Sequence, residues 1–243
     1  MSAPAPRPPL EPAPDRAGFA VGFGTYQAVF GFVYLGLAVN LALAVAAAPL
    51  LVFADAAAEG VVEHPLRAWP LLPPLTLGIG PVVVAAFAAF RQHRSAGSTT
   101  PVLDLLAGLR RTGRRATTCW AATVALVTML LVDLTWAWHS PLGALLVPVF
   151  AVLTALTLAV AMQLLVMLEQ LPTTGLAALA RAAVYLAVRR WYLSLGNLVV
   201  LVVVGLGIGV RPVPALAIGP ACALYLVWSN NTNATAVAIE QAG

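Results

Sequence analysis

The chain has 243 residues, of which 61% are hydrophobic and only 9% are charged. Because charged residues make up about a quarter of a soluble domain, this composition excludes a water-soluble globular protein and predicts a polytopic membrane protein. The formal net charge of +4 at pH 7 would allow a nucleic-acid partner. Arginines placed between apolar runs instead favour contact with the anionic inner leaflet of a membrane, so we expect no nucleic-acid partner.

The first 18 residues form a proline-rich segment without an apolar run. Such a segment cannot bury enough surface to fold, so we expect a disordered cytoplasmic tail. A signal peptide is not expected, because the first apolar run, residues 29–53, has 25 residues and no small-residue cleavage pattern at a fitting distance.

The rest of the chain contains apolar runs long enough, or nearly long enough, to cross a bilayer, which takes about 20 residues each. They are residues 29–53, 71–90, 116–138, 142–168, 191–210 and 213–228. These runs predict an all-α transmembrane helix bundle of about six spans over residues 19–235, followed by a cytoplasmic tail at 236–243. The last run is the weakest, because Pro212, Pro214 and Pro220 crowd its start.

The arginines predict the sidedness of these spans. Residues 91–115 hold six of the chain's 13 arginines, namely Arg91, Arg94, Arg110, Arg111, Arg114 and Arg115. Since Lys and Arg are enriched in cytoplasmic loops, this segment is expected inside the cell. With both termini also inside, only Arg67 and Arg211 lie outside. We therefore predict a multi-pass protein of the cell membrane with the N- and C-termini in the cytoplasm.

Two cytoplasmic stretches have the helical spacing of an amphipathic surface helix. In the first, residues 102–109, apolar side chains recur at Val102, Leu105, Leu106 and Leu109. The second, residues 176–190, has a stripe of Leu176, Leu179, Ala183 and Leu186. We expect both to lie at the membrane surface, although the second is equally consistent with an extension of the next span. The arginines expected to contact lipid headgroups or a partner are Arg110, Arg111, Arg114, Arg115, Arg181, Arg189 and Arg190.

Four polar side chains within the spans are candidates for an intramembrane polar site: Asp133, Asn40, Asn197 and Gln163. Asp133 is followed by Trp136 and Trp138, which are typical of the membrane interface, so it is expected near the outer surface. The alternative is a buried site that contacts a substrate, a proton or Arg67. The three amides are expected to hydrogen-bond between helices.

The sequence offers no pattern for catalysis, a cofactor or a metal ion. It has no H-E-x-x-H, no paired cysteines and no G-x-S-x-G. The two cysteines, Cys119 and Cys222, lie in apolar runs and are expected to be buried small hydrophobic residues and not a disulfide. The glycines of residues 205–209 are expected to form a packing face between helices.

A weak internal repeat is also present. Residues 77–81 (LGIGP) resemble residues 216–220 (LAIGP), and the run from Tyr34 to Asn40 resembles the run from Tyr192 to Asn197. The first two spans would then correspond to the last two in parallel orientation. Transporters often contain such repeats, so a small-solute transporter is the alternative function.

Several segments resemble the YesL-like bacterial membrane proteins. They are Asn40 with Pro49, Trp69-Pro70 leading to Gly80-Pro81 and residues 85–91, the basic helix ending at Arg115, and Arg190-Trp191. The likeness covers about residues 19–235, and an acidic insertion at residues 54–70 departs from the commoner pattern. The resemblance implies an accessory role in carbohydrate uptake beside ABC importer subunits. The family has no established biochemical activity, so the resemblance assigns no functional residues. We expect no enzymatic activity, because the spans hold no cluster of acid, base or nucleophile.

Overall fold

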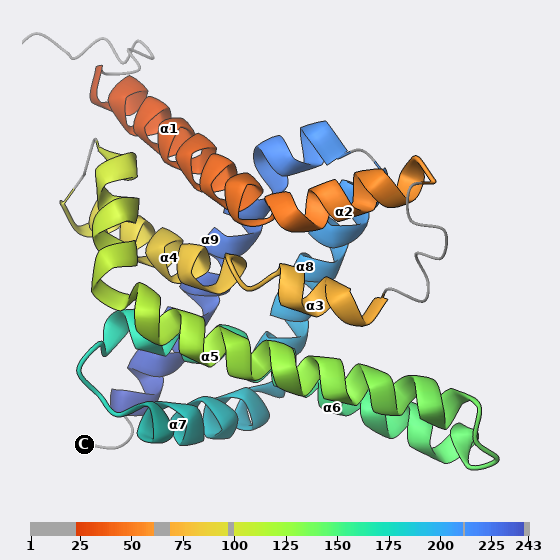
Figure 1. Ribbon diagram of the computed structural model, residues 1–243. Helices are drawn as coiled ribbons and strands as arrows, with labels where there is room; N and C mark the ends of the chain where they lie inside the picture. Colours follow the sequence, from red (N-terminus) through yellow and green to blue (C-terminus); the bar gives the residue numbers. More distant parts are fainter. Residues whose placement is uncertain (1–22, 61–68, 97–99, 211, 241–243) are drawn as a thin grey trace, which may run out of the picture.

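The computed structural model describes residues 23–60, 69–96, 100–210 and 212–240, and these residues form an all-α fold (Figure 1). The predicted N-terminal tail, the predicted outer arginines Arg67 and Arg211, and residues 241–243 lie outside the described residues. The helices are α1 (Phe23–Ala46), α2 (Ala48–Ala58), the 3-10 turn η1 (Trp69–Leu71), α3 (Leu72–Leu75), α4 (Ile79–Ala96), α5 (Pro101–Trp138), α6 (Gly143–Gln170), α7 (Leu176–Arg189), α8 (Trp191–Val210) and α9 (Pro212–Glu240).

Four of the described helices are long and apolar enough to cross a membrane. They contain Val29–Ala46, Pro101–Trp138, Gly143–Gln170 and Trp191–Val210. These segments correspond to the first, third, fourth and fifth predicted spans. The all-α class is therefore confirmed, and so is the presence of several helices that are able to span a membrane. The second and sixth predicted spans fall in α4 and α9, which do not meet the same criteria, and a total of six spans therefore stays a prediction.

Helix α4 is the centre of the fold. Its residues 83–90 are all buried, with Val84, Ala86, Phe87 and Ala89 completely inaccessible. Helices α1, α5, α6 and α9 all pack against it. A helix that is apolar on every side belongs in the interior, which explains why this segment lies inside the protein.

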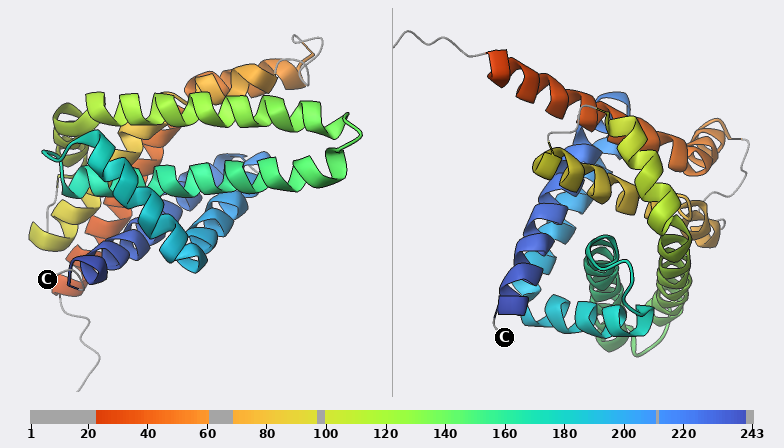
Figure 2. Two further views of the ribbon diagram at one scale, coloured as in Figure 1. Left: turned by 90° about the horizontal axis from the view of Figure 1, so that it is seen from below. Right: turned by 90° about the vertical axis from the view of Figure 1, so that its left-hand side faces the viewer.

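The longest unit is the antiparallel hairpin of α5 and α6, which the views from different sides show side by side (Figure 2). Helix α4 begins beside the middle of α5, where Trp120 Nε1 donates a hydrogen bond to the carbonyl of Thr76 at 2.8 Å. From Trp120 to Trp138, α5 continues for about 27 Å at 1.5 Å per residue. The tip of the hairpin therefore extends well beyond the start of α4. Helices α8 and α9 form a second antiparallel pair that crosses the hairpin (Figure 1).

Two predicted spans are interrupted. The run 29–53 is divided at Ala47 between α1 and α2, because Pro49 in the first turn of α2 has no N–H with which to continue the hydrogen bonding of α1. The run 71–90 contains the four-residue helix α3, a turn at residues 76–78, and then α4. Pro73, Pro74 and the glycines that follow favour turns over a continuous helix.

The first amphipathic stretch is not a separate helix, because it is the first part of α5. Figure 1 shows that α5 bends after its first few turns. Near the bend, the hydroxyls of Thr112 and Thr117 donate to the carbonyls four residues earlier, at 3.0 and 2.9 Å, a pattern that often bends helices. Of the predicted apolar face, Leu105 is buried but Val102, Leu106 and Leu109 are exposed, so most of that face is directed away from the protein.

The second amphipathic stretch forms the separate helix α7. Its predicted stripe faces the protein, since Leu179, Ala183 and Leu186 are buried where α7 packs on α6 and α8. The cation at Arg181 is exposed on the other side.

Candidate functional site

A buried carboxylate is the most distinctive polar group in the described residues. The Glu169 side chain, at the end of α6, is fully buried. Its Oε1 accepts a hydrogen bond from Arg91 Nε of α4 at 2.6 Å and lies 3.4 Å from Arg111 Nη2 of α5. One carboxylate oxygen therefore joins the ends of three helices through charge-assisted contacts.

Sequence reasoning missed Glu169. It lies one residue beyond the predicted span 142–168, whereas α6 continues to Gln170. The signal that would have found it is a single acid directly after an apolar run, in a chain whose basic segment needs a counter-charge.

A small polar cavity of about 180 Å³ lies beside this ion cluster between α4 and α5. Arg91, Arg111 and Asp104 contribute to its walls. The second oxygen of Glu169, Oε2, has no hydrogen-bond partner among the described residues. The cluster is suited to holding α5 against α4 and α6, because two half-exposed guanidinium groups share one buried negative charge.

Asn40 joins α1 to the backbone of α9 beside Pro220. Its Nδ2 donates to the carbonyl of Ala217 at 2.5 Å, and its Oδ1 accepts from the N–H of Ala221 at 2.7 Å. An uninterrupted α-helix pairs these same two backbone groups, four residues apart, with each other. Pro220 lies between them inside α9. The Asn40 amide thus satisfies the backbone beside a helical proline, which confirms its predicted role between helices.

Asn197 joins α8 to α9 in a second amide cluster. Its Nδ2 donates to Asn231 Oδ1 at 2.8 Å and its Oδ1 accepts from Asn230 Nδ2 at 3.0 Å. Gln170 Nε2 of α6 donates to Thr232 Oγ1 at 3.0 Å, one residue further along α9. Gln163 is buried on α6. The predicted role of Asn197 between helices is therefore confirmed, and its partners were not predicted.

Asp133 is remote from the other predicted polar residues. It is partly exposed on α5, in the half that extends beyond α4, and makes no hydrogen bond or ion pair with any described residue. The nearby Trp136 and Trp138 are 65% and 71% exposed, as expected for aromatic side chains that contact a membrane interface. The structure therefore does not bring Asp133, Asn40, Asn197 and Gln163 together into one site.

The predicted contact arginines differ in their surroundings. Arg110 and Arg114 are exposed, whereas Arg115 donates to the carbonyl of Thr174 in the turn before α7. On α7, Arg181 Nε donates to the carbonyl of Ala177 at 3.3 Å, and Arg189 lies against the Tyr185 ring. Arg190 is half-buried after α7. Arg111 is part of the ion cluster described above.

A cavity of about 420 Å³ adjoins Asn40 between α1 and α9. Its other walls are apolar, with Phe32, Phe90 and Ile218 among them, and the Asn40 amide is occupied by the α9 backbone. This cavity is poorly suited to a polar solute. Cys222 lines it and is exposed, so the expected burial of this cysteine is wrong, because α9 presents this side chain at the surface.

The predicted packing face of residues 205–209 is confirmed only at Gly207, where an added Cβ would lie 3.6 Å from Ala215 Cβ of α9. A Cβ added to Gly205 or Gly209 would meet no atom of the described residues within 4 Å. The sequence repeat also lacks matching contacts, since Asn40 bonds to α9 beside Pro220, whereas Asn197 bonds to the same helix further along.

No group of three or more His, Cys, Asp or Glu side chains that could hold a metal ion occurs in the described part of the chain. Comparison of the chain with protein-family models, with curated proteins and with solved structures finds no match.

Proposed function

We propose that the chain is a non-enzymatic accessory protein of carbohydrate uptake that crosses the plasma membrane six times, with both termini in the cytoplasm. The link to ABC-type uptake comes from the YesL-like resemblance of the sequence. The structural support comes from the surface of α8 and from the grouping of the basic residues at one end of the bundle.

The proposed sidedness is supported by contacts between helix ends. Arg91, at the end of α4, and Arg111, near the start of α5, both contact Glu169 at the end of α6. All three ends belong on the cytoplasmic side if the basic segment is inside. The start of α8 and the later part of α9 are joined there too, through Asn197 and Asn230.

The observation that carries the accessory role is the exposure of α8. Its apolar surface is directed away from the rest of the chain, with Val203 62% and Leu206 66% exposed. Gly205 and Gly209 lie on nearly the same side of the helix, and no atom lies within 4 Å of the position of an added Cβ at either. Small residues four apart allow a second membrane helix to approach closely. A transmembrane helix of an importer subunit is the proposed occupant.

The test is copurification of importer permease subunits with the native chain in mild detergent. We expect the subunits to copurify with the wild type and to be lost from the double variant Gly205→Leu, Gly209→Leu. The matched control is Gly196→Leu. Gly196 also has open space around it, but it lies nine residues before Gly205, about two and a half turns away, and so on the opposite side of α8.

Two outcomes would count against the proposal. If importer subunits are repeatedly absent from the wild-type preparation, the accessory role is overturned. If they copurify with the wild type and with both glycine variants alike, α8 is not the surface that binds them.

A further inference from the structure

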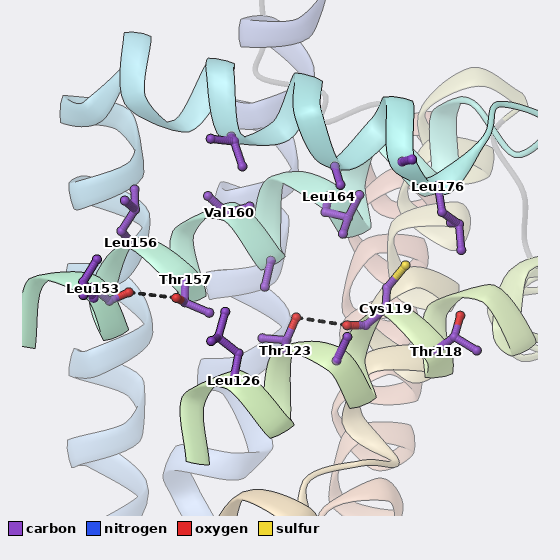
Figure 3. A pocket seen from close by; sticks show the side chains of 15 residues that line it. Thr118, Cys119, Thr123, Leu126, Leu153, Leu156, Thr157, Val160, Leu164 and Leu176 are labelled. Atoms are coloured by element: carbon purple, nitrogen blue, oxygen red, sulfur yellow. Dashed lines mark hydrogen bonds between the residues drawn. The ribbon is translucent and has the colours of Figure 1, made fainter. Parts of the chain in front are cut away.

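A groove of about 560 Å³ lies between α5, α6 and α7. Figure 3 shows side chains from all three helices converging on it. Leu126 and Cys119 line it from α5, Val160 and Leu164 from α6, and Val184 from α7. Its volume is in the range of protein pockets that bind small molecules, about 300 to 1,000 Å³.

The hydroxyl groups in the wall of the groove are satisfied by their own helices. Thr118 Oγ1 donates to the carbonyl of Arg115 at 2.8 Å, Thr123 to that of Cys119 at 3.0 Å, and Thr157 to that of Leu153 at 2.8 Å. Figure 3 marks the last two of these bonds. Because these polar groups already have partners, the wall presents mainly carbon atoms, which favours a hydrocarbon ligand over a polar one.

Three arginines lie close in the chain to residues that line this groove. Arg114 and Arg115 lie one helical turn before Thr118 and Cys119, two of its lining residues. Arg181 lies on α7, next to Ala180 and one turn after Ala177, which both line it. Among the described residues, neither Arg114, Arg115 nor Arg181 forms an ion pair with a carboxylate. The apolar groove is therefore flanked by cations that lack a carboxylate counter-charge among the described residues.

We propose that this groove holds an acyl chain of an anionic phospholipid, with the headgroup phosphate bound by Arg115 and Arg181. The inference rests on the proposed function, in that the basic end of the protein faces the cytoplasmic leaflet. Guanidinium groups bind phosphate oxygens through paired charge-assisted hydrogen bonds. Basic pockets between membrane helices on the cytoplasmic side are suited to anionic headgroups. The groove meets both requirements, because its hydrocarbon wall adjoins cations that have no carboxylate partner among the described residues.

The test measures which lipid the purified full chain retains. The protein in mild detergent is incubated with equal amounts of phosphatidylglycerol and phosphatidylcholine carrying the same acyl chains, and bound lipid is counted by native mass spectrometry. We expect the wild type to prefer phosphatidylglycerol by about tenfold. The double variant Arg115→Gln, Arg181→Gln is expected to bind the two lipids equally.

Two further variants separate the site from general charge and from the fold. Arg110→Gln with Arg189→Gln removes the same charge from other parts of α5 and α7 and should keep the preference. Ala177→Phe places a ring in the groove and should lower retention of both lipids. Circular dichroism and gel filtration of each variant check that the helices and the monodisperse state are retained.

The proposal is overturned if the wild type shows no preference, or if the two double variants lose it equally. It is also overturned if soluble glycerol phosphate displaces the lipid, because the acyl chain would then contribute nothing. The assay is carried out in detergent and does not depend on sidedness. A basic segment found outside the cell would therefore contradict the proposed function while leaving the lipid preference in place.

Discussion

Asn40 shows how one amide can support a proline within a distant helix. Pro220 removes an N–H from the interior of α9, and the Asn40 side chain bonds to one backbone group on each side of it. In a bilayer no water is available to do this, so a side chain from a neighbouring helix has to. The packing of α1 on α9 and the hydrogen bonding of the backbone beside Pro220 therefore depend on the same two hydrogen bonds.

Asn40→Leu is expected to lower the free energy of unfolding by about 1 to 3 kcal/mol, because it leaves buried backbone groups of α9 without partners. Unfolding by SDS in mixed micelles measures the change. The control Leu41→Ala alters a 68% exposed neighbour and should have little effect. In the double variant with Pro220→Ala, the proline ring no longer crowds the preceding turn, so the Ala221 N–H can pair with the Ala217 carbonyl and the loss due to Asn40→Leu should be smaller. Equal losses in both backgrounds would contradict the role assigned to Asn40.

The ion cluster of Glu169 predicts an asymmetry between its members. The Arg91 and Arg111 side chains are 45% and 46% exposed, whereas Glu169 is 0% exposed. Removing Arg91 leaves a buried carboxylate with one longer contact, which is expected to cost about 3 kcal/mol. Removing the carboxylate leaves two cations that water can reach, which should cost less.

The measurement compares Arg91→Met with Glu169→Gln by the same unfolding assay. Arg91→Met should be the more destabilising of the two, and Arg110→Met, at an exposed position, should be close to neutral. If Glu169→Gln were the more damaging, the carboxylate would be needed for more than its pairing with Arg91.

At the residue scale, the sequence was informative where a residue was unusual for its surroundings. Asn40 and Asn197 are amides in apolar runs, and both proved to join helices. Their partners were not predictable, because they depend on which helices become neighbours in the fold. Glu169 was missed because the helix end was placed two residues too early, at 168 and not at Gln170, and this difference decides whether the acid belongs to a loop or to the core.

At the scale of the elements, close helix contacts depend on glycine. A Cβ added at Gly80, in the first turn of α4, would lie 2.4 Å from Trp120 Cβ and Cγ, which is far inside van der Waals contact. A Cβ on Gly108 would lie 3.0 Å from Ala88 Cβ and 3.2 Å from Ala85 Cα. These glycines allow α5 to lie directly against α4.

Gly80→Ala is therefore expected to destabilise the fold by about 1 to 3 kcal/mol, since α4 or Trp120 must move to relieve the overlap. The comparison is Gly196→Ala, which has open space in the middle of a helix and should be neutral or stabilising by up to about 1 kcal/mol. Thermal unfolding followed by circular dichroism distinguishes the two. A similar midpoint for both variants would show that the contact at Trp120 is easily relieved.

The elements themselves were predictable where the apolar run had no breaker. The predicted span 191–210 has the same bounds as α8. The runs 29–53 and 71–90 contain Pro49 and Pro73-Pro74, and the structure divides both of them there or nearby. A hydropathy pattern counts apolar residues and does not depend on whether a residue has an N–H. Each of these two runs was therefore predicted as one helix, whereas the structure divides it between helices. The inward face of α7 was likewise not distinguishable from a membrane-facing one by spacing alone.

For the whole molecule, the main prediction is the side of the membrane on which each end lies. In a background of Cys119→Ser and Cys222→Ser, single cysteines at Arg110 and Trp138 are placed at opposite ends of α5. A membrane-impermeant maleimide added to intact cells should label Trp138→Cys. It should label Arg110→Cys only after the cells are permeabilised. The reverse pattern would invert the orientation of the entire bundle.

The pairing of α1 with α9 also bears on how the protein is made. The hydrogen-bond partners of Asn40 lie 177 and 181 residues later in the chain. While the ribosome is still translating the intervening segments, Asn40 lies in the membrane or at the translocon, and its amide has no hydrogen-bond partner from α9. Assembly is thus completed by the segment synthesised last, and a nascent chain that stops before α9 leaves one side of α4 uncovered and recognisable to membrane quality control.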